Sequence, residues 1–202
     1  VLDDLPPKPP SIVKPPHEDP LPLSWKVRDI GRPLKGGQQI SENYWCLYGG
    51  GNDIWNTNDQ FRYAYQKINT DFNFSIKIDS LYNVHQYAKA GLMIRKSLNS
   101  NSAHGLVNMF PSGNTEFGYR TSNGETMKAK SGPRIDLKNA RLKIKKSNEI
   151  VEFFVLNSNA WEKIGELNIA KWGKSFYVGI ATLSHDNSQL TKAQYSEIFL
   201  TY

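Results

Sequence analysis

Charged and apolar side chains alternate along one stretch of the chain, residues 88–95. Lys89, Met93 and Arg95 occupy odd positions there, while the even positions are all apolar. A period of two places these three side chains on one face of a β-strand. Arginine forks donate paired hydrogen bonds and aromatic rings stack on apolar ring faces, which is the chemistry of sugar recognition. The candidate ligand-binding residues are therefore Arg95, Lys89 and Met93, with Tyr63, Tyr65, Tyr119 and Arg120 from neighbouring strands.

Arg95 has a second interpretation that the sequence leaves open. An arginine on a strand with mostly apolar neighbours is expected to have a defined partner. That partner is either a ligand or an internal carboxylate such as Asp53, which would make Arg95 half of a structural ion pair. The tyrosines are equally ambiguous, because a core aromatic residue with one solvated hydroxyl shows the same sequence pattern as a sugar platform.

The segment 52–59 is rich in oxygen ligands. Asp53 and Asp59 lie there among asparagine and threonine side chains, and calcium takes about six to eight oxygen ligands. The spacing does not match an EF-hand. The alternative is that both carboxylates accept backbone hydrogen bonds and pin a turn, with Trp55 packed beneath it. Asp53 and Asp59 are thus the candidate metal ligands, calcium is the metal they would hold, and no other cofactor is expected.

The sequence shows no pattern of catalytic residues. Retaining glycosidases need two carboxyl groups about 5 Å apart, which on one strand means acidic residues at alternating positions. Glu149 and Glu152 differ in parity and would point to opposite faces. The single cysteine, Cys46, lies in an aromatic stretch, and the spacing of the four histidines suggests neither a catalytic pair nor a zinc site. We therefore expect no catalytic residues and no enzyme.

The elements that must position these residues are strands. Short runs rich in aromatic and β-branched residues alternate with clusters of Gly, Asn, Ser and Asp. Helical periodicity is lacking, apart from one possible turn at 168–174. The pattern predicts an all-β fold, a two-sheet antiparallel β-sandwich of the jelly-roll type. The predicted strands cover 61–65, 72–78, 88–95, 103–110, 115–121, 140–146, 149–156, 160–168, 175–183 and 193–201.

The first 22 residues form a distinct segment that contains eight of the eleven prolines. Proline lacks a backbone donor and favours extended conformations, so 1–22 is interpreted as a leader and spacer, with the folded domain covering 23–202. A spacer implies an upstream domain or a surface anchor. No apolar run approaches the ~20 residues of a transmembrane segment.

The chain carries a net charge of +6, which permits an acidic partner. Its densest basic cluster lies within 138–146, where charges alternate with apolar residues as on a strand with one solvated face. Nucleic acid is therefore not expected as a partner, because the charge lacks interleaved exposed aromatic residues.

Several motifs occur in a defined order along the chain, at 49–55, 59–66, 88–98, 102–104, 117–120, Trp172, 178–181 and 184–186. Together they resemble the DUF1349-type domains of the concanavalin A-like lectin/glucanase superfamily. The resemblance spans roughly residues 24–200 and implies a curved double sheet that binds a polysaccharide or other glycan. Such domains are accessory modules of exported bacterial proteins, which implies an extracellular or cell-surface location.

These observations favour a non-catalytic carbohydrate-binding module. Two alternatives remain open. One is a spacer or protein-interaction domain, which a smooth sheet without a pocket would favour. The other is a divergent polysaccharide hydrolase or lyase, which two carboxylates facing each other across a cleft would favour.

Overall fold

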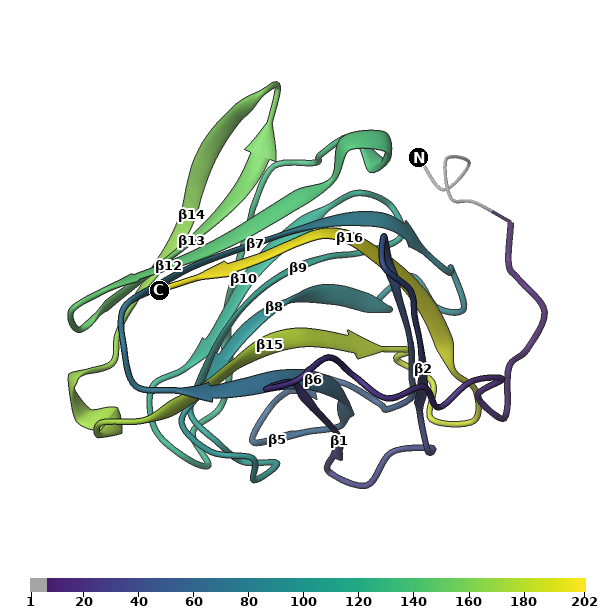
Figure 1. Ribbon diagram of the computed structural model, residues 1–202, viewed down its shortest axis with the longest axis horizontal. Helices are drawn as coiled ribbons and strands as arrows, with labels where there is room; N and C mark the ends of the chain where they lie inside the picture. The colour runs from purple at the N-terminus through teal and green to yellow at the C-terminus, as the bar shows by residue number, and fades with distance from the viewer. Residues whose placement is uncertain (1–6) are drawn as a thin grey trace.

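The computed structural model describes residues 7–202, so the first six residues of the predicted leader lie outside the described part. Two antiparallel sheets of seven strands each form two layers (Figure 1). We name each sheet after its central strand. The β8 sheet has the order β1 (Lys26–Ile30), β6 (Phe61–Ile68), β15 (Phe176–Leu183), β8 (Lys89–Arg95), β9 (His104–Met109), β10 (Thr115–Arg120) and β11 (Lys128–Ser131). The β7 sheet has the order β14 (Ala160–Asn168), β13 (Ile150–Asn157), β12 (Arg141–Ser147), β7 (Phe72–Leu81), β16 (Thr191–Thr201), β3 (Trp45–Gly49) and β2 (Gly37–Ile40).

Four smaller elements complete the fold over residues 7–202. β4 (Ile54–Trp55) and β5 (Asn58–Asp59) form a short hairpin, and η1 (Leu137–Asn139) and η2 (Ala170–Trp172) are single 3-10 turns. The predicted all-β sandwich of two antiparallel sheets is confirmed, and the turn expected at 168–174 is η2. Over residues 7–202, no helix has the length and apolar character needed to cross a membrane.

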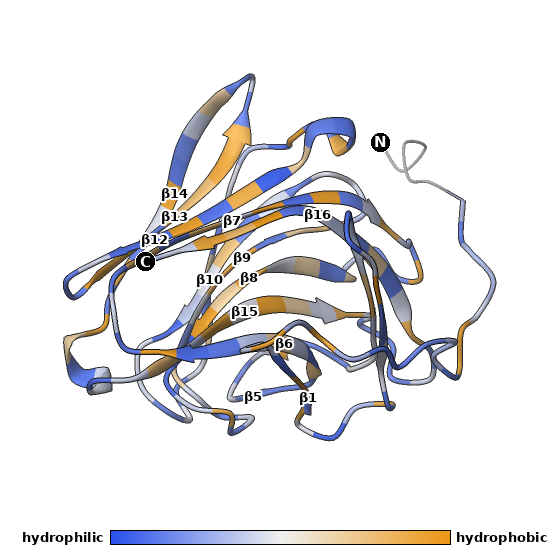
Figure 2. Ribbon diagram, viewed as in Figure 1, coloured by the Kyte–Doolittle hydropathy of each residue, from blue (hydrophilic) through white to orange (hydrophobic). Residues whose placement is uncertain are grey.

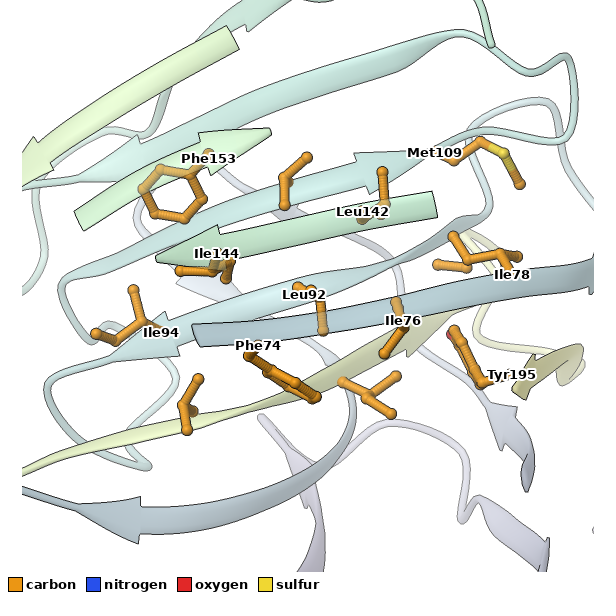
Figure 3. Close-up of a cluster of buried hydrophobic side chains, with 14 of the residues drawn as sticks. Phe74, Ile76, Ile78, Leu92, Ile94, Met109, Leu142, Ile144, Phe153 and Tyr195 are labelled. Carbon is orange, nitrogen blue, oxygen red and sulfur yellow. The ribbon is translucent and has the colours of Figure 1, made fainter. Parts of the chain in front are cut away.

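The main core lies between the two sheets. β7 contributes Phe74, Ile76 and Ile78, and β8 contributes Leu92 and Ile94 from the opposite layer (Figure 3). Burying one such side chain stabilises the fold by roughly 1.5–3 kcal/mol. The intervening positions of β7 are polar, and bands of orange and blue therefore alternate along the strands of the β7 sheet (Figure 2). The period of two in the sequence thus selects the core face.

The β8 sheet is apolar on its outer face as well, the face turned away from the β7 sheet. Tyr63, Met93 and Leu106 form a second buried cluster there with Ile54 and Met127, which come from covering loops. Every residue of β8 is consequently buried. The covering loops are the feature of the fold that builds the site.

The proline-rich leader lies against the body of the domain. The backbone oxygen of Ile12 accepts a hydrogen bond from Leu190 N (2.6 Å), and the backbone oxygen of His17 accepts one from Gln38 N (3.0 Å). Asp19 N in turn donates to Gln38 O (2.9 Å). The described part of the leader therefore covers the edge of the β7 sheet at β2.

Candidate functional site

A buried charge cluster anchors the β4–β5 hairpin to the outer face of the β8 sheet. Asp59 of the hairpin accepts hydrogen bonds from Arg95 Nη1 (2.7 Å) and from two nitrogens of Arg120 (3.0 and 3.1 Å). His104 Nδ1 lies 3.6 Å from the same carboxylate. None of these four side chains has exposed surface. The carboxylate of Asp59 thus serves as counter-charge to two arginines on the strands.

The same arginines hold the neighbouring loops. Arg95 donates to carbonyl oxygens in the loop 97–99 (3.2 and 2.7 Å). Arg120 donates to the carbonyl oxygens of Asn56 (2.8 Å) and Glu125 (2.6 Å). Three loops are therefore fixed over the sheet by two side chains, and the loop that carries β4 and β5 keeps a defined position.

Electrostatics keep this cluster in one protonation state. Burial raises the pKa of Asp59, but the facing His104, Arg95 and Arg120 outweigh that effect, so the pKa lies below its ordinary value. Burial lowers the pKa of His104 to about 3, with Asp59 opposing and the two guanidinium groups adding to the shift. His104 is therefore neutral and Asp59 is charged at physiological pH.

A cleft of about 800 Å³ opens beside this anchored loop, at the end of the outer face where β8 begins. It lies between the β4–β5 loop, the segment that precedes β8, and the turn between β9 and β10. Its charged and titratable lining residues are Asp53, Lys89, Glu116 and His185. The remaining lining residues are Trp55, Gln86, Tyr87, Phe110, Ser112, Asn114, Thr115, Ser131 and Gly132.

A lysine between two carboxylates forms the floor of the cleft. Lys89 Nζ lies 2.6 Å from Asp53 Oδ1 and 3.9 Å from Glu116 Oε1. The lysine side chain is 4% exposed, whereas Asp53 is 25% and Glu116 is 17% exposed. Burial raises the pKa of Glu116, an effect that Lys89 partly opposes and Asp53 reinforces. The floor therefore offers one ammonium and two acidic side chains to a ligand.

Aromatic rings form the rim of the cleft. Trp55 is 38% exposed and Tyr87 is 50% exposed. Tyr87 packs edge-on against Phe110, with ring centroids 5.9 Å apart. Lys89 Nζ lies 5.6 Å from the Trp55 ring and 5.8 Å from the Phe110 ring, so these rings flank the charged floor. The site therefore combines partly solvated ring faces with buried polar groups.

Two histidines adjoin the rim. The rings of His85 and His185 stack with centroids 4.3 Å apart, and Tyr87 lies 5.4 Å from His185. His185 Nε2 lies 3.2 Å from Asp53 Oδ2. Burial, with the neighbouring His185, lowers the pKa of His85. Asp53 is therefore held from two sides, by a lysine and by an imidazole.

The structure places the predicted ligand residues in different environments. Lys89 lines the cleft. Tyr63, Met93, Arg95 and Arg120 have no exposed surface, Tyr65 is almost fully buried under the loops, and Tyr119 packs on the side of the main core. The partner of Arg95 is Asp59, while the expected Asp53 pairs with Lys89. The second interpretation of Arg95, a structural ion pair, is the one that the geometry supports.

The two candidate calcium ligands are engaged by side-chain cations. Asp53 binds Lys89, and Asp59 binds Arg95 and Arg120. Within residues 7–202, no group of three or more His, Cys, Asp or Glu residues could hold a metal ion. The carboxylates therefore fix the loop, and Trp55, expected beneath the turn, faces solvent at the rim.

Several cleft residues were missed by sequence reasoning. Tyr87 and Phe110 are isolated aromatic residues at loop positions, and Trp55 lies on the two-residue strand β4. Glu116 lies on a predicted strand that carries no second acidic residue on the same face. A usable signal was the position of Tyr87 and Phe110. They flank β8 and β9, which pair antiparallel and thus bring the two loop ends together.

Comparisons with known proteins give the class of fold. No family model and no curated protein matches the chain. A protein of unknown function from Saccharomyces cerevisiae is similar in structure, with a TM-score of 0.67 and 10% identity over 88% of this chain and 96% of that one. The carbohydrate-binding module CBM66 from Bacillus subtilis has a TM-score of 0.57 and 10% identity over 94% and 99% of the two chains.

A glycoside hydrolase is also similar. The GH43 protein BlXynB from Bacillus licheniformis has a TM-score of 0.61 and 15% identity over 89% of this chain and 37% of that one. At these identities the likeness shows the fold alone, a two-sheet jelly-roll β-sandwich. This fold occurs in both binding modules and hydrolases, so function must be argued from the site.

Proposed function

We propose that this chain is a lectin-like carbohydrate-binding module of the DUF1349 type, and that the cleft is its glycan site. The observation that carries the proposal is the rim of partly exposed rings, Trp55 and Tyr87, around the polar floor at Lys89. The likeness to a carbohydrate-binding module supports it. The module would belong to an exported bacterial protein, joined through its leader to an upstream domain or a surface anchor.

The chemistry of the cleft suits a sugar ring. Trp55 and Tyr87 present π-faces on which the apolar C–H face of a sugar stacks. Lys89 and Glu116 supply a donor and an acceptor for hydroxyl groups at the base. The volume of about 800 Å³ falls within the range of small-ligand sites.

The test is a binding screen of the purified domain against plant, algal and host polysaccharides, with and without calcium. Trp55→Ala should lower affinity at least tenfold, because it removes one stacking surface. Trp161→Ala is the matched control, since Trp161 is also 38% exposed but lies on β14 of the other sheet. A native protein that binds no polysaccharide would refute the proposal. Loss of binding in the control variant alone would move the site to the β7 sheet.

A polysaccharide hydrolase is the second candidate, because Asp53 and Glu116 both approach the Lys89 ammonium. Their carboxyl groups are therefore close enough for the acid and base of a glycosidase, which stand roughly 5–10 Å apart. The likeness to a GH43 protein adds to it. The lysine that bonds to Asp53 argues for binding, since it neutralises the base. Release of reducing sugars that disappears in Glu116→Gln, with binding retained, would establish the hydrolase.

A further inference from the structure

Buried polar atoms without a hydrogen-bond partner lie at Glu116, which lines the cleft, and at its strand neighbour Asn108. Asn108 on β9 has no exposed surface, and neither its amide nitrogen nor its amide oxygen has a hydrogen-bond partner among residues 7–202. Glu116 Oε1, on the neighbouring strand β10, is also buried and accepts no hydrogen bond within the described chain, although the Lys89 ammonium lies 3.9 Å away. Buried polar groups are nearly always hydrogen-bonded in proteins. These atoms therefore point to a group that a ligand brings.

The register of the sheet places the two residues side by side. Asn108 is paired directly with Glu116 in the β9–β10 ladder, and with Gly91 in the β8–β9 ladder. Residues in register share a face, with Cβ atoms about 4.5–5.5 Å apart. A Cβ on Gly91 would lie 2.8 Å from the Cα and Cβ of Asn108, so the glycine allows β9 to approach β8 closely at Asn108. An amide and a carboxyl group thus stand side by side on the β8 sheet, and the carboxyl group lines the cleft.

The missing partner must both donate and accept hydrogen bonds. The amide of Asn108 offers N–H donors and a carbonyl acceptor, and Glu116 Oε1 offers an acceptor when ionised. A sugar hydroxyl has one donor and two acceptor lone pairs, so it can accept from the Asn108 amide nitrogen and donate its single proton to Glu116 Oε1. A carboxylate or sulfate has acceptors alone and would leave Glu116 unsatisfied.

The local charge of the cleft also favours an uncharged ligand. The lining residues carry two carboxylates, Asp53 and Glu116, against the single ammonium of Lys89, which Asp53 already binds at 2.6 Å. The imidazole of His185 is likewise directed at Asp53. The excess positive charge of the chain, +6 overall, is therefore not available in the cleft. An acidic sugar would therefore meet an excess of negative charge there.

We propose that the cleft selects uncharged sugar residues over uronates and sulfated sugars, and that Asn108 and Glu116 form a subsite for one sugar hydroxyl. This inference rests on the proposed glycan-binding function and gives its substrate class. It runs against the basic composition of the chain, which by itself would favour acidic glycans.

Matched polymers test the selectivity. Polygalacturonate and alginate are compared with the same polymers after reduction of their carboxyl groups to hydroxymethyl groups, by affinity electrophoresis and calorimetry at pH 7.5. Of the two reduced polymers, the one that the native protein binds more tightly should bind at least tenfold more tightly than its acidic parent. Glu116→Gln, which keeps the shape and removes one negative charge, should reduce that ratio at least threefold. Asn108→Leu should lower binding of the reduced polymer at least tenfold while the melting profile stays cooperative.

The outcomes separate this inference from the proposed function. Tighter binding of the acidic polymers that Trp55→Ala still weakens would keep the glycan site and overturn the selectivity. An unchanged ratio in Glu116→Gln would overturn the role of that carboxyl group. If neither the reduced nor the acidic polymers bind and a broader neutral panel also fails, the proposed function falls, and this inference falls with it.

Discussion

The buried charge cluster predicts a large asymmetry between two acid-to-amide substitutions. In Asp59→Asn, the carboxylate that accepts three hydrogen bonds from Arg95 and Arg120 becomes a neutral amide. Two guanidinium groups without exposed surface then lose their counter-charge. Removing one partner of a buried ion pair costs about 3–5 kcal/mol, because the remaining charge is left uncompensated. We expect the free energy of unfolding to fall by that amount.

Glu197→Gln is the matched control. Glu197 also binds an arginine through two hydrogen bonds, to Arg141 at 2.6 and 2.9 Å, but its side chain is 43% exposed. Exposed pairs contribute about 0–1 kcal/mol, since water solvates the separated charges. The control should therefore lose less than about 1 kcal/mol.

The assay is urea unfolding followed by tryptophan fluorescence, together with calorimetric melting. For a domain of this size, about 1 kcal/mol corresponds to roughly 2–4 °C, so Asp59→Asn should lower the melting temperature by roughly 6–20 °C. Combining it with Arg95→Met should restore part of the loss, because one uncompensated charge is removed. A loss in Asp59→Asn that equals the loss in Glu197→Gln would refute the argument that burial makes this cluster critical.

Three further predictions concern pH and packing. His104 is neutral in the fold, with a pKa lowered from 6.5 to about 3, so the unfolded chain takes up a proton first as pH falls. Between pH 6.5 and 5 this costs about 2 kcal/mol of stability. Over this pH range, the free energy of unfolding of His104→Gln, measured by urea titration, should fall by about 2 kcal/mol less than that of the native protein. The pKa of Glu116 is raised by burial, so its ionisation costs stability as pH rises through the unfolded and then the folded pKa. Glu116→Gln should therefore gain stability over the native protein at pH 7.5 and lose that advantage by pH 4, and an equal difference at both values would contradict the shift. Leu92 has no exposed surface in the main core, so Leu92→Ala should cost about 2–5 kcal/mol in the same unfolding assay, whereas a loss below about 1 kcal/mol would mean that the core repacks.

The fold class followed from local periodicity. Alternation along 72–78 and 88–95 reports which side chains share a face, because successive residues of a strand point to opposite sides. Lys89, Met93 and Arg95 were accordingly predicted on one face, and the structure places them there, away from Leu92 and Ile94. That information is local, so it is present in the sequence without any knowledge of the rest of the chain.

Whether that face is solvated was decided by tertiary structure. The hairpin that carries Asp59 folds over the sheet and binds Arg95, which is 36 positions away in the sequence. The alternation of odd and even positions along a strand cannot reveal such a contact, because burial of a face depends on which distant loop covers it. The same loop buries Met93 while it sets Trp55 beside Lys89. The sequence by itself determined the strands and which side chains share a face of a strand. The long-range ion pairs determined which of these side chains a ligand can reach.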